Sequence, residues 1–78
     1  MTFYCGIDLH SKKSQMCIIN KDGEKVKEGK LDNDLSLILE FLKPFGKGMH
    51  IAIECTINWY WLVDGLKDKG YDVRLAHT

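Results

Sequence analysis

The chain lacks most of the features that would set it apart from an ordinary small globular domain. Its 78 residues include a single proline, and eleven basic residues balance eleven acidic ones. This balance excludes a polycationic nucleic-acid binder, so any nucleic-acid contact must come from a local patch. No apolar run approaches the ~20 residues of a membrane span, and no charged leader precedes a long apolar stretch, so we expect neither a membrane segment nor a secretory signal.

Cysteine is also scarce. The three cysteines, Cys5, Cys17 and Cys55, cannot all pair within one chain, and none of them forms a CxxC spacing. Two of them stand in apolar, strand-like runs, where a free cysteine behaves as a small hydrophobic residue. We therefore predict no disulfide framework and a reducing, cytoplasmic location.

The first 31 residues predict an antiparallel meander of three strands. Residues 2–8 are apolar on both faces, as is typical of a central strand, and residues 15–20 form the second strand. Asp22-Gly23 is a strong hairpin signal. Residues 25–31 are more polar, as an edge strand often is.

The spacing of apolar residues then changes to that of helices. Leu35, Ile38, Leu39 and Leu42 form one stripe, capped by Asp32 or Asn33 and stopped by Pro44 and Gly46. The remaining elements predicted are a strand at 50–54, a helix from Thr56 or Asn58 to Lys69 that ends at Gly70, and a strand at 72–76.

The predicted order is thus βββαβαβ, in a single α/β domain that spans residues 1–78. A strand, a helix and a further strand favour parallel pairing through a right-handed crossover. If the fourth strand pairs with the first, the sheet order is 3-2-1-4-5. Both crossovers then proceed in one direction, so both helices cover the same face of a mixed sheet.

Two carboxylates end neighbouring strands in this arrangement. Asp8 ends the first strand and Glu54 the fourth, and alternation turns both toward the face without helices. Two such carboxylates repel each other unless a cation lies between them, and Mg²⁺ or Mn²⁺ suits oxygen ligands of this kind. The simpler alternatives stay open: Asp8 can open a turn, and Glu54 can favour the positive end of the next helix.

At these residues the chain resembles a known family. YCGIDLHSKKSQMCIINKDGE and AIECTINWYWLVDGLKDKGYDVRLAH are similar to the first two blocks of the bacterial transposases related to the invertase Piv, insertion-sequence family one hundred ten. The resemblance covers nearly the whole chain. Its most specific part is Glu54 followed by Asn58-Trp59 and a strand that ends Leu75-Ala76-His77.

The resemblance implies a ribonuclease H-like (RuvC-like) fold and a DNA transposase with four acidic metal ligands. Asp8 matches the first acidic position and Glu54 the second. In the family the other two acidic residues lie downstream, a further domain carries a catalytic serine, and a structured guide RNA directs recombination of DNA. We therefore expect an N-terminal portion of such an enzyme, inactive alone. Ile57 departs from the usual glycine after the second acidic residue.

Other residues near the carboxylates permit two interpretations. Lys12 and Lys13, with His10, could contact phosphate near a metal, or could simply form a solvated turn. We expect Trp59 in the core and Trp61 exposed, where it could meet a partner domain or nucleic acid.

Two other function classes stay open. An actin-like ATPase or sugar-kinase lobe also opens with Gly-Ile-Asp, although the turn after Asp8 lacks the glycine and threonine that cradle phosphate there. A non-enzymatic interaction domain could use the uncovered sheet face, and we expect self-association through it.

Overall fold

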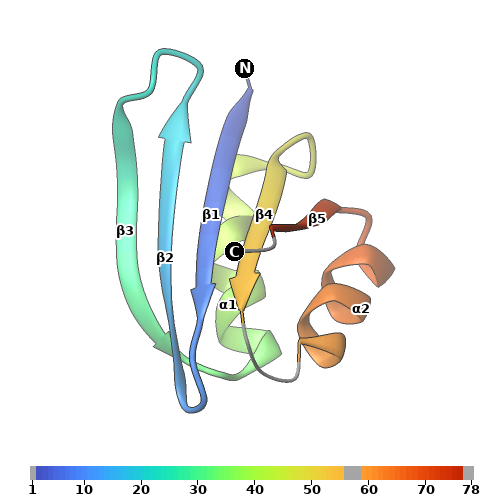
Figure 1. Cartoon of the computed structure of the whole chain (residues 1–78). Coiled ribbons are helices and arrows are strands. Elements are labelled where there is room, and N and C mark those ends of the chain that lie inside the picture. The colour runs from blue at the N-terminus through green and yellow to red at the C-terminus, as the bar shows by residue number, and fades with distance from the viewer. Residues whose placement is uncertain (1, 56–58, 77–78) are drawn as a thin grey trace.

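The computed structural model describes residues 2–55 and 59–76, which form one five-stranded mixed sheet and two α-helices (Figure 1). The elements follow one another as β1 (Phe3–Leu9), β2 (Lys13–Asn20), β3 (Lys25–Asp32), α1 (Leu35–Leu42), the 3₁₀ turn η1 (Lys43–Phe45), β4 (His50–Cys55), α2 (Tyr60–Asp68) and β5 (Asp72–Ala76). The sheet order is β3-β2-β1-β4-β5, with β2 antiparallel to both of its neighbours and β1, β4 and β5 parallel. The predicted ribonuclease H-like topology is confirmed.

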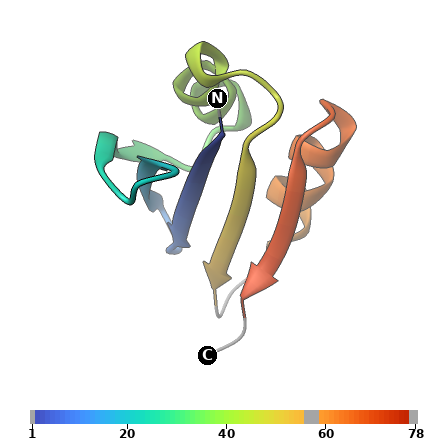
Figure 2. The ribbon, with the colours of Figure 1, turned by 90° about the horizontal axis from the view of Figure 1, so that it is seen from above.

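Both helices lie on one face of the sheet. Figure 1 looks onto the opposite, open face, with α1 behind the strands, and Figure 2 shows the layers from above. The helices contribute six buried side chains to the core beneath the sheet: Ile38, Phe41, Leu42, Leu62, Val63 and Leu66. None of the helices in the described part of the chain is long and apolar enough to cross a membrane.

Alternation along β1 separates a covered face from an open face. Cys5, Ile7 and Leu9 point into the core and are at most 3% exposed, whereas Tyr4 on the other side is 43% exposed. Ile51 and Ile53 on β4 repeat the pattern, because their register partners are Cys5 and Ile7. The side chains that the helices leave uncovered are therefore those of Asp8 and its neighbours. Self-association through this face stays a prediction.

The start of α1 corrects the sequence analysis. Asp34, rather than Asp32 or Asn33, is the N-cap, and its carboxylate accepts a hydrogen bond from the backbone N–H of Ser36 at 2.8 Å. Asp32 is still paired in β3, and the side chain of Asn33 bonds to other residues. The cap therefore falls one residue beyond the predicted pair.

The helix α2 begins at Tyr60, and the predicted starting residues Thr56 and Asn58 lie outside the described residues, as does Ile57. The helix ends at Asp68, one residue before the predicted end, and the predicted stop at Gly70 is confirmed: Gly70 has φ of 91°, a conformation that favours glycine. Trp59 packs against the core as expected, but the prediction of an exposed Trp61 is wrong. Trp61 is half-buried against the core, because a tryptophan ring is large enough to reach the core from the flank of a helix.

Candidate metal centre

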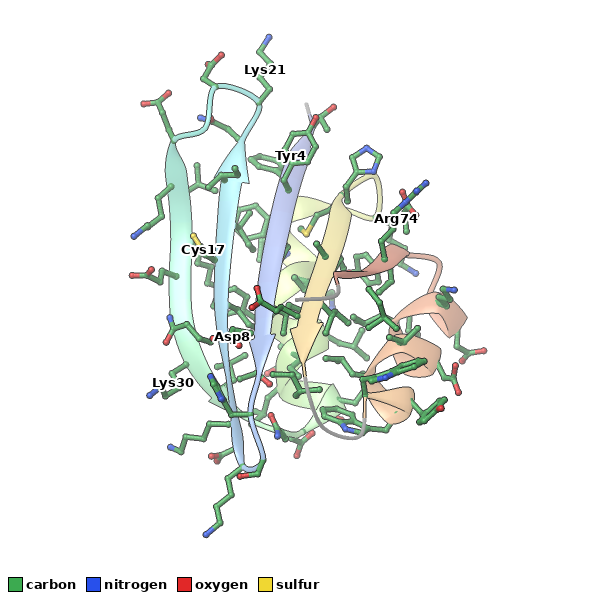
Figure 3. The ribbon with its side chains drawn as sticks, viewed as in Figure 1. Tyr4, Asp8, Cys17, Lys21, Lys30 and Arg74 are labelled. Atoms are coloured by element: carbon green, nitrogen blue, oxygen red, sulfur yellow. The ribbon has the colours of Figure 1, made fainter. Side chains whose placement is uncertain are left out.

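The parallel pairing of β1 with β4 brings the two predicted carboxylates together. Asp8 and Glu54 are direct register partners near the carboxyl ends of these strands. Neighbouring strands lie about 4.8 Å apart, so paired side chains on one face are close neighbours. Both residues are exposed on the open face, and Figure 3 shows Asp8 projecting toward the viewer from β1. The predicted juxtaposition is therefore present, at the sheet edge where α/β folds place ligands.

Neither carboxylate is neutralised by a lysine or arginine among the described residues. Oδ2 of Asp8 lies 3.1 Å from Nε2 of His10, and no described side chain forms a hydrogen bond or ion pair with Glu54. Two adjacent anionic groups without a paired cation are the donor set that a hard divalent cation prefers. The residues present therefore fit Mg²⁺ or Mn²⁺.

A shallow hollow of about 260 Å³ lies over the two carboxylates. Gly6 and Ala52, also register partners, line it, and apart from Gly6 itself and its two chain neighbours no heavy atom lies within 4 Å of the position a Cβ would take on Gly6. Its lining residues are Gly6, Ile7, Asp8, Gln15, Cys17, Ala52 and Glu54. Small residues next to the acidic pair leave room there for a bound group.

The structure places Lys12 and Lys13 in the turn after β1 and at the start of β2. Nζ of Lys13 lies 3.5 Å from a carboxylate oxygen of Asp32, and both side chains are more than half exposed. Such an exposed pair contributes little to stability, so Lys13 can leave Asp32 and contact a phosphate instead. The predicted contact of Lys12 and Lys13 with nucleic acid stays a prediction.

The described residues supply only part of a full coordination shell. They contain no group of three or more His, Cys, Asp or Glu side chains that could hold a metal ion. Asp8 and Glu54 would thus be two protein ligands, with water or other groups in the remaining positions. His10, for which the sequence left two interpretations open, contacts Asp8 directly, and nothing in the sequence pattern beyond its proximity to Asp8 indicated this contact.

Comparison with known proteins places the chain in a family. The family model of the IS110-type DEDD transposases, described as a transposase, matches residues 5–78. No curated protein matches the chain. Among solved structures, the chain is similar to the Argonaute of Marinitoga piezophila, crystallised in complex with a 5′ OH guide RNA, at 17% identity and a TM-score of 0.48. The similarity covers 97% of this chain but only 16% of that one. From the family match over residues 5–78, the chain belongs to the DEDD transposases of insertion-sequence family one hundred ten.

Proposed function

We propose that Asp8 and Glu54 hold a divalent cation, Mg²⁺ or Mn²⁺, at a site where a transposase cleaves or transfers DNA strands. The observation that carries the proposal is the direct register pairing of the two carboxylates on the open sheet face. Membership of a transposase family supports the same assignment and favours it over an actin-like ATPase.

Each residue has a simple role in this proposal. The carboxylates of Asp8 and Glu54 bind the cation and fix it at the edge of the sheet, while Lys12 and Lys13 contact a nearby phosphate of the DNA. A bound divalent cation supplies positive charge that polarises a phosphodiester and stabilises the charge that develops as it breaks.

We infer that this chain binds metal weakly and does not turn over DNA alone. Its described residues offer two carboxylates to one cation, whereas the family resemblance implies four. The same proposal includes two additional downstream acidic residues, a serine-bearing domain and a guide RNA. Joined to these parts, the chain would act on DNA as one portion of an RNA-directed recombinase.

The experiment is a titration of the chain with Mn²⁺, observed through backbone amide NMR signals. Paramagnetic broadening should be strongest around Asp8 and Glu54 at millimolar Mn²⁺, and Mg²⁺ should compete. The Asp8→Asn and Glu54→Gln variants should each lose the effect. Asp64→Asn, which neutralises an exposed carboxylate on α2, is the matched control and should leave it unchanged.

The proposal fails if the wild-type signals around Asp8 and Glu54 do not respond at millimolar Mn²⁺. It fails also if Asp64→Asn reduces the broadening as much as Asp8→Asn does, because the metal would then be attracted by general negative charge.

A further inference from the structure

The contact between His10 and Asp8 needs support from elsewhere in the fold. The two side chains are 63% and 56% exposed, and Nε2 of His10 lies 3.1 Å from Oδ2 of Asp8. An exposed pair of this kind is too weak to hold a loop residue in one place by itself. Because a carboxylate only accepts hydrogen bonds, Nε2 must carry the hydrogen in this contact. The position of His10 must therefore be fixed by bonds to the turn after β1.

Asn33, in the connection between β3 and α1, forms two hydrogen bonds to that turn and a third to the strand β2 that follows it. Its Nδ2 donates to the carbonyl of His10 at 2.6 Å, and its backbone N–H donates to the carbonyl of Lys12 at 3.0 Å. Its Oδ1 accepts from the hydroxyl of Ser14 at 2.6 Å. The carbonyl of His10 can only accept, so the amide orientation of Asn33 is determined by its partners.

Ser14 gives this arrangement a rigid base. It is the one buried polar residue among those described, with 0% exposure, and it stands at the start of β2 opposite Leu9. A buried hydroxyl without a partner would be costly, so the bond from Ser14 to Asn33 is strongly favoured. The backbone N–H of His10 also donates to the carbonyl of Lys13 at 3.0 Å, which closes the turn.

We propose that Asn33 and His10 are positioning residues of the metal site. Asn33, held by buried Ser14, fixes the turn after β1, and the His10 ring then holds one oxygen of Asp8. The other oxygen is left free to bind the cation together with Glu54. This inference rests on the proposed function, since it assigns the hydrogen bonds of Asn33 and His10 a role at the same metal site.

The test compares variants of the whole chain by two measurements. The first, without metal, is the χ1 rotamer of Asp8 from three-bond NMR couplings. The wild-type chain should show a single rotamer, and His10→Ala and Asn33→Ala should show averaging. The second is Mn²⁺ affinity, which should fall roughly tenfold in both variants, as for loss of a group that orients a metal ligand.

Two further variants separate positioning from general structural damage. His10→Gln keeps an N–H donor at a similar reach and should retain the single rotamer and Mn²⁺ affinity within about twofold. Asn20→Ala is the matched control, because Asn20 accepts bonds from the N–H groups of Asp22 and Glu24 in the other hairpin, away from Asp8. It should leave both measurements unchanged.

The outcomes distinguish this inference from the proposed function. An averaged Asp8 rotamer in the wild-type chain overturns the inference, as does unchanged Mn²⁺ affinity in His10→Ala and Asn33→Ala when the wild-type chain binds. If the wild-type chain does not bind Mn²⁺ at all, the proposed function fails and the inference fails with it. Equal losses in Asn20→Ala and Asn33→Ala also overturn the inference.

Discussion

The two faces of the sheet are built from the same strands but differ in the burial and polarity of their side chains. On the covered face, Ile7, Met16 and Ile53 are 0–2% exposed and pack under the helices. On the open face, two of the register pairs between β1 and β4 are small or charged, namely Gly6 with Ala52 and Asp8 with Glu54. Successive side chains of a strand point to opposite faces, so one segment can serve both purposes. Stability is therefore concentrated on one side of the sheet, and the candidate chemistry on the other.

The largest effect should come from shortening a core side chain. Ile53→Ala, on the covered face, should lower the free energy of unfolding by about 2–5 kcal/mol, because it removes buried methyl groups and leaves a cavity. Tyr4→Ala, on the open face, should cost about 1 kcal/mol or less, since the ring is 43% exposed. Urea denaturation followed by tryptophan fluorescence measures both. Equal losses would contradict the division between the faces.

Two of the cysteines in the sheet, Cys5 on the covered face and Cys17 on the open face, should respond differently to pH. Burial raises the pKa of the Cys5 thiol to about 12, from an ordinary value of 9.0. The folded chain thus holds this proton more tightly than the unfolded chain. The associated stability is complete below pH 9.0 and is lost as the pH rises from there toward 12.

The unfolding free energy should therefore fall by about 1 kcal/mol between pH 8 and pH 10 through Cys5 alone. Cys5→Ala should show a correspondingly smaller fall over that interval. Cys17→Ala, on the open face, is the control and should keep most of the wild-type fall, because burial is the largest cause of the raised Cys5 pKa and the charge of Cys17 contributes less. Identical slopes for the Cys5→Ala and wild-type chains would show that the Cys5 thiol is not buried as described.

Glycines on the two faces of the sheet should respond differently to substitution by alanine. A Cβ on Gly6, on the open face, would have no heavy atom within 4 Å, whereas a Cβ on Gly29 would lie 3.1 Å from Cε2 of Phe41. Gly6→Ala should stabilise the chain by roughly 0.5 kcal/mol, because alanine loses less backbone entropy on folding. Gly29→Ala should be less stable than Gly6→Ala by about 1 kcal/mol in the same denaturation experiment. A reversed order would mean that Phe41 moves aside freely.

The smallest effect is expected for a polar pair on the open face. Nδ1 of His50 lies 2.9 Å from Oδ2 of Asp72, with both side chains about half exposed at 53% and 48%. Asp72→Asn should change the free energy of unfolding by about 0.5 kcal/mol or less, since solvent and salt screen such pairs. A loss above 1 kcal/mol, measured in low salt and in 0.5 M NaCl, would show that the open face contributes more to stability than we infer.

The sequence predicted the sheet and its acidic pair because both depend on local, periodic signals. The alternation of apolar and polar residues in β1 and β4 determined which face each residue occupies, and the crossover rule placed these strands side by side. The strand boundaries were close to those observed, so Asp8 and Glu54 were predicted to be neighbours.

The features that the sequence did not predict depend on contacts between distant segments. Asn33 was expected to cap α1, but its amide is used by Ser14 and His10, and Asp34 takes the cap instead. The sequence alone cannot decide which of two adjacent residues caps a helix when both are good caps, because the choice depends on whether one of them forms hydrogen bonds elsewhere in the fold. The packing of Trp61 on the core likewise depends on how far its ring reaches, which helical spacing does not describe.

The register of β1 with β4 would also link the proposed metal binding to the folding of the chain. Asp8 belongs to the strand that opens the meander, whereas Glu54 arrives only after α1 has crossed over and β4 has paired. When these two strands separate, Asp8 stays on β1 and Glu54 on β4, so the two carboxylates can no longer bind one cation. A cation bound between them would thus oppose that separation by mass action, and the free energy of unfolding would rise with the cation concentration.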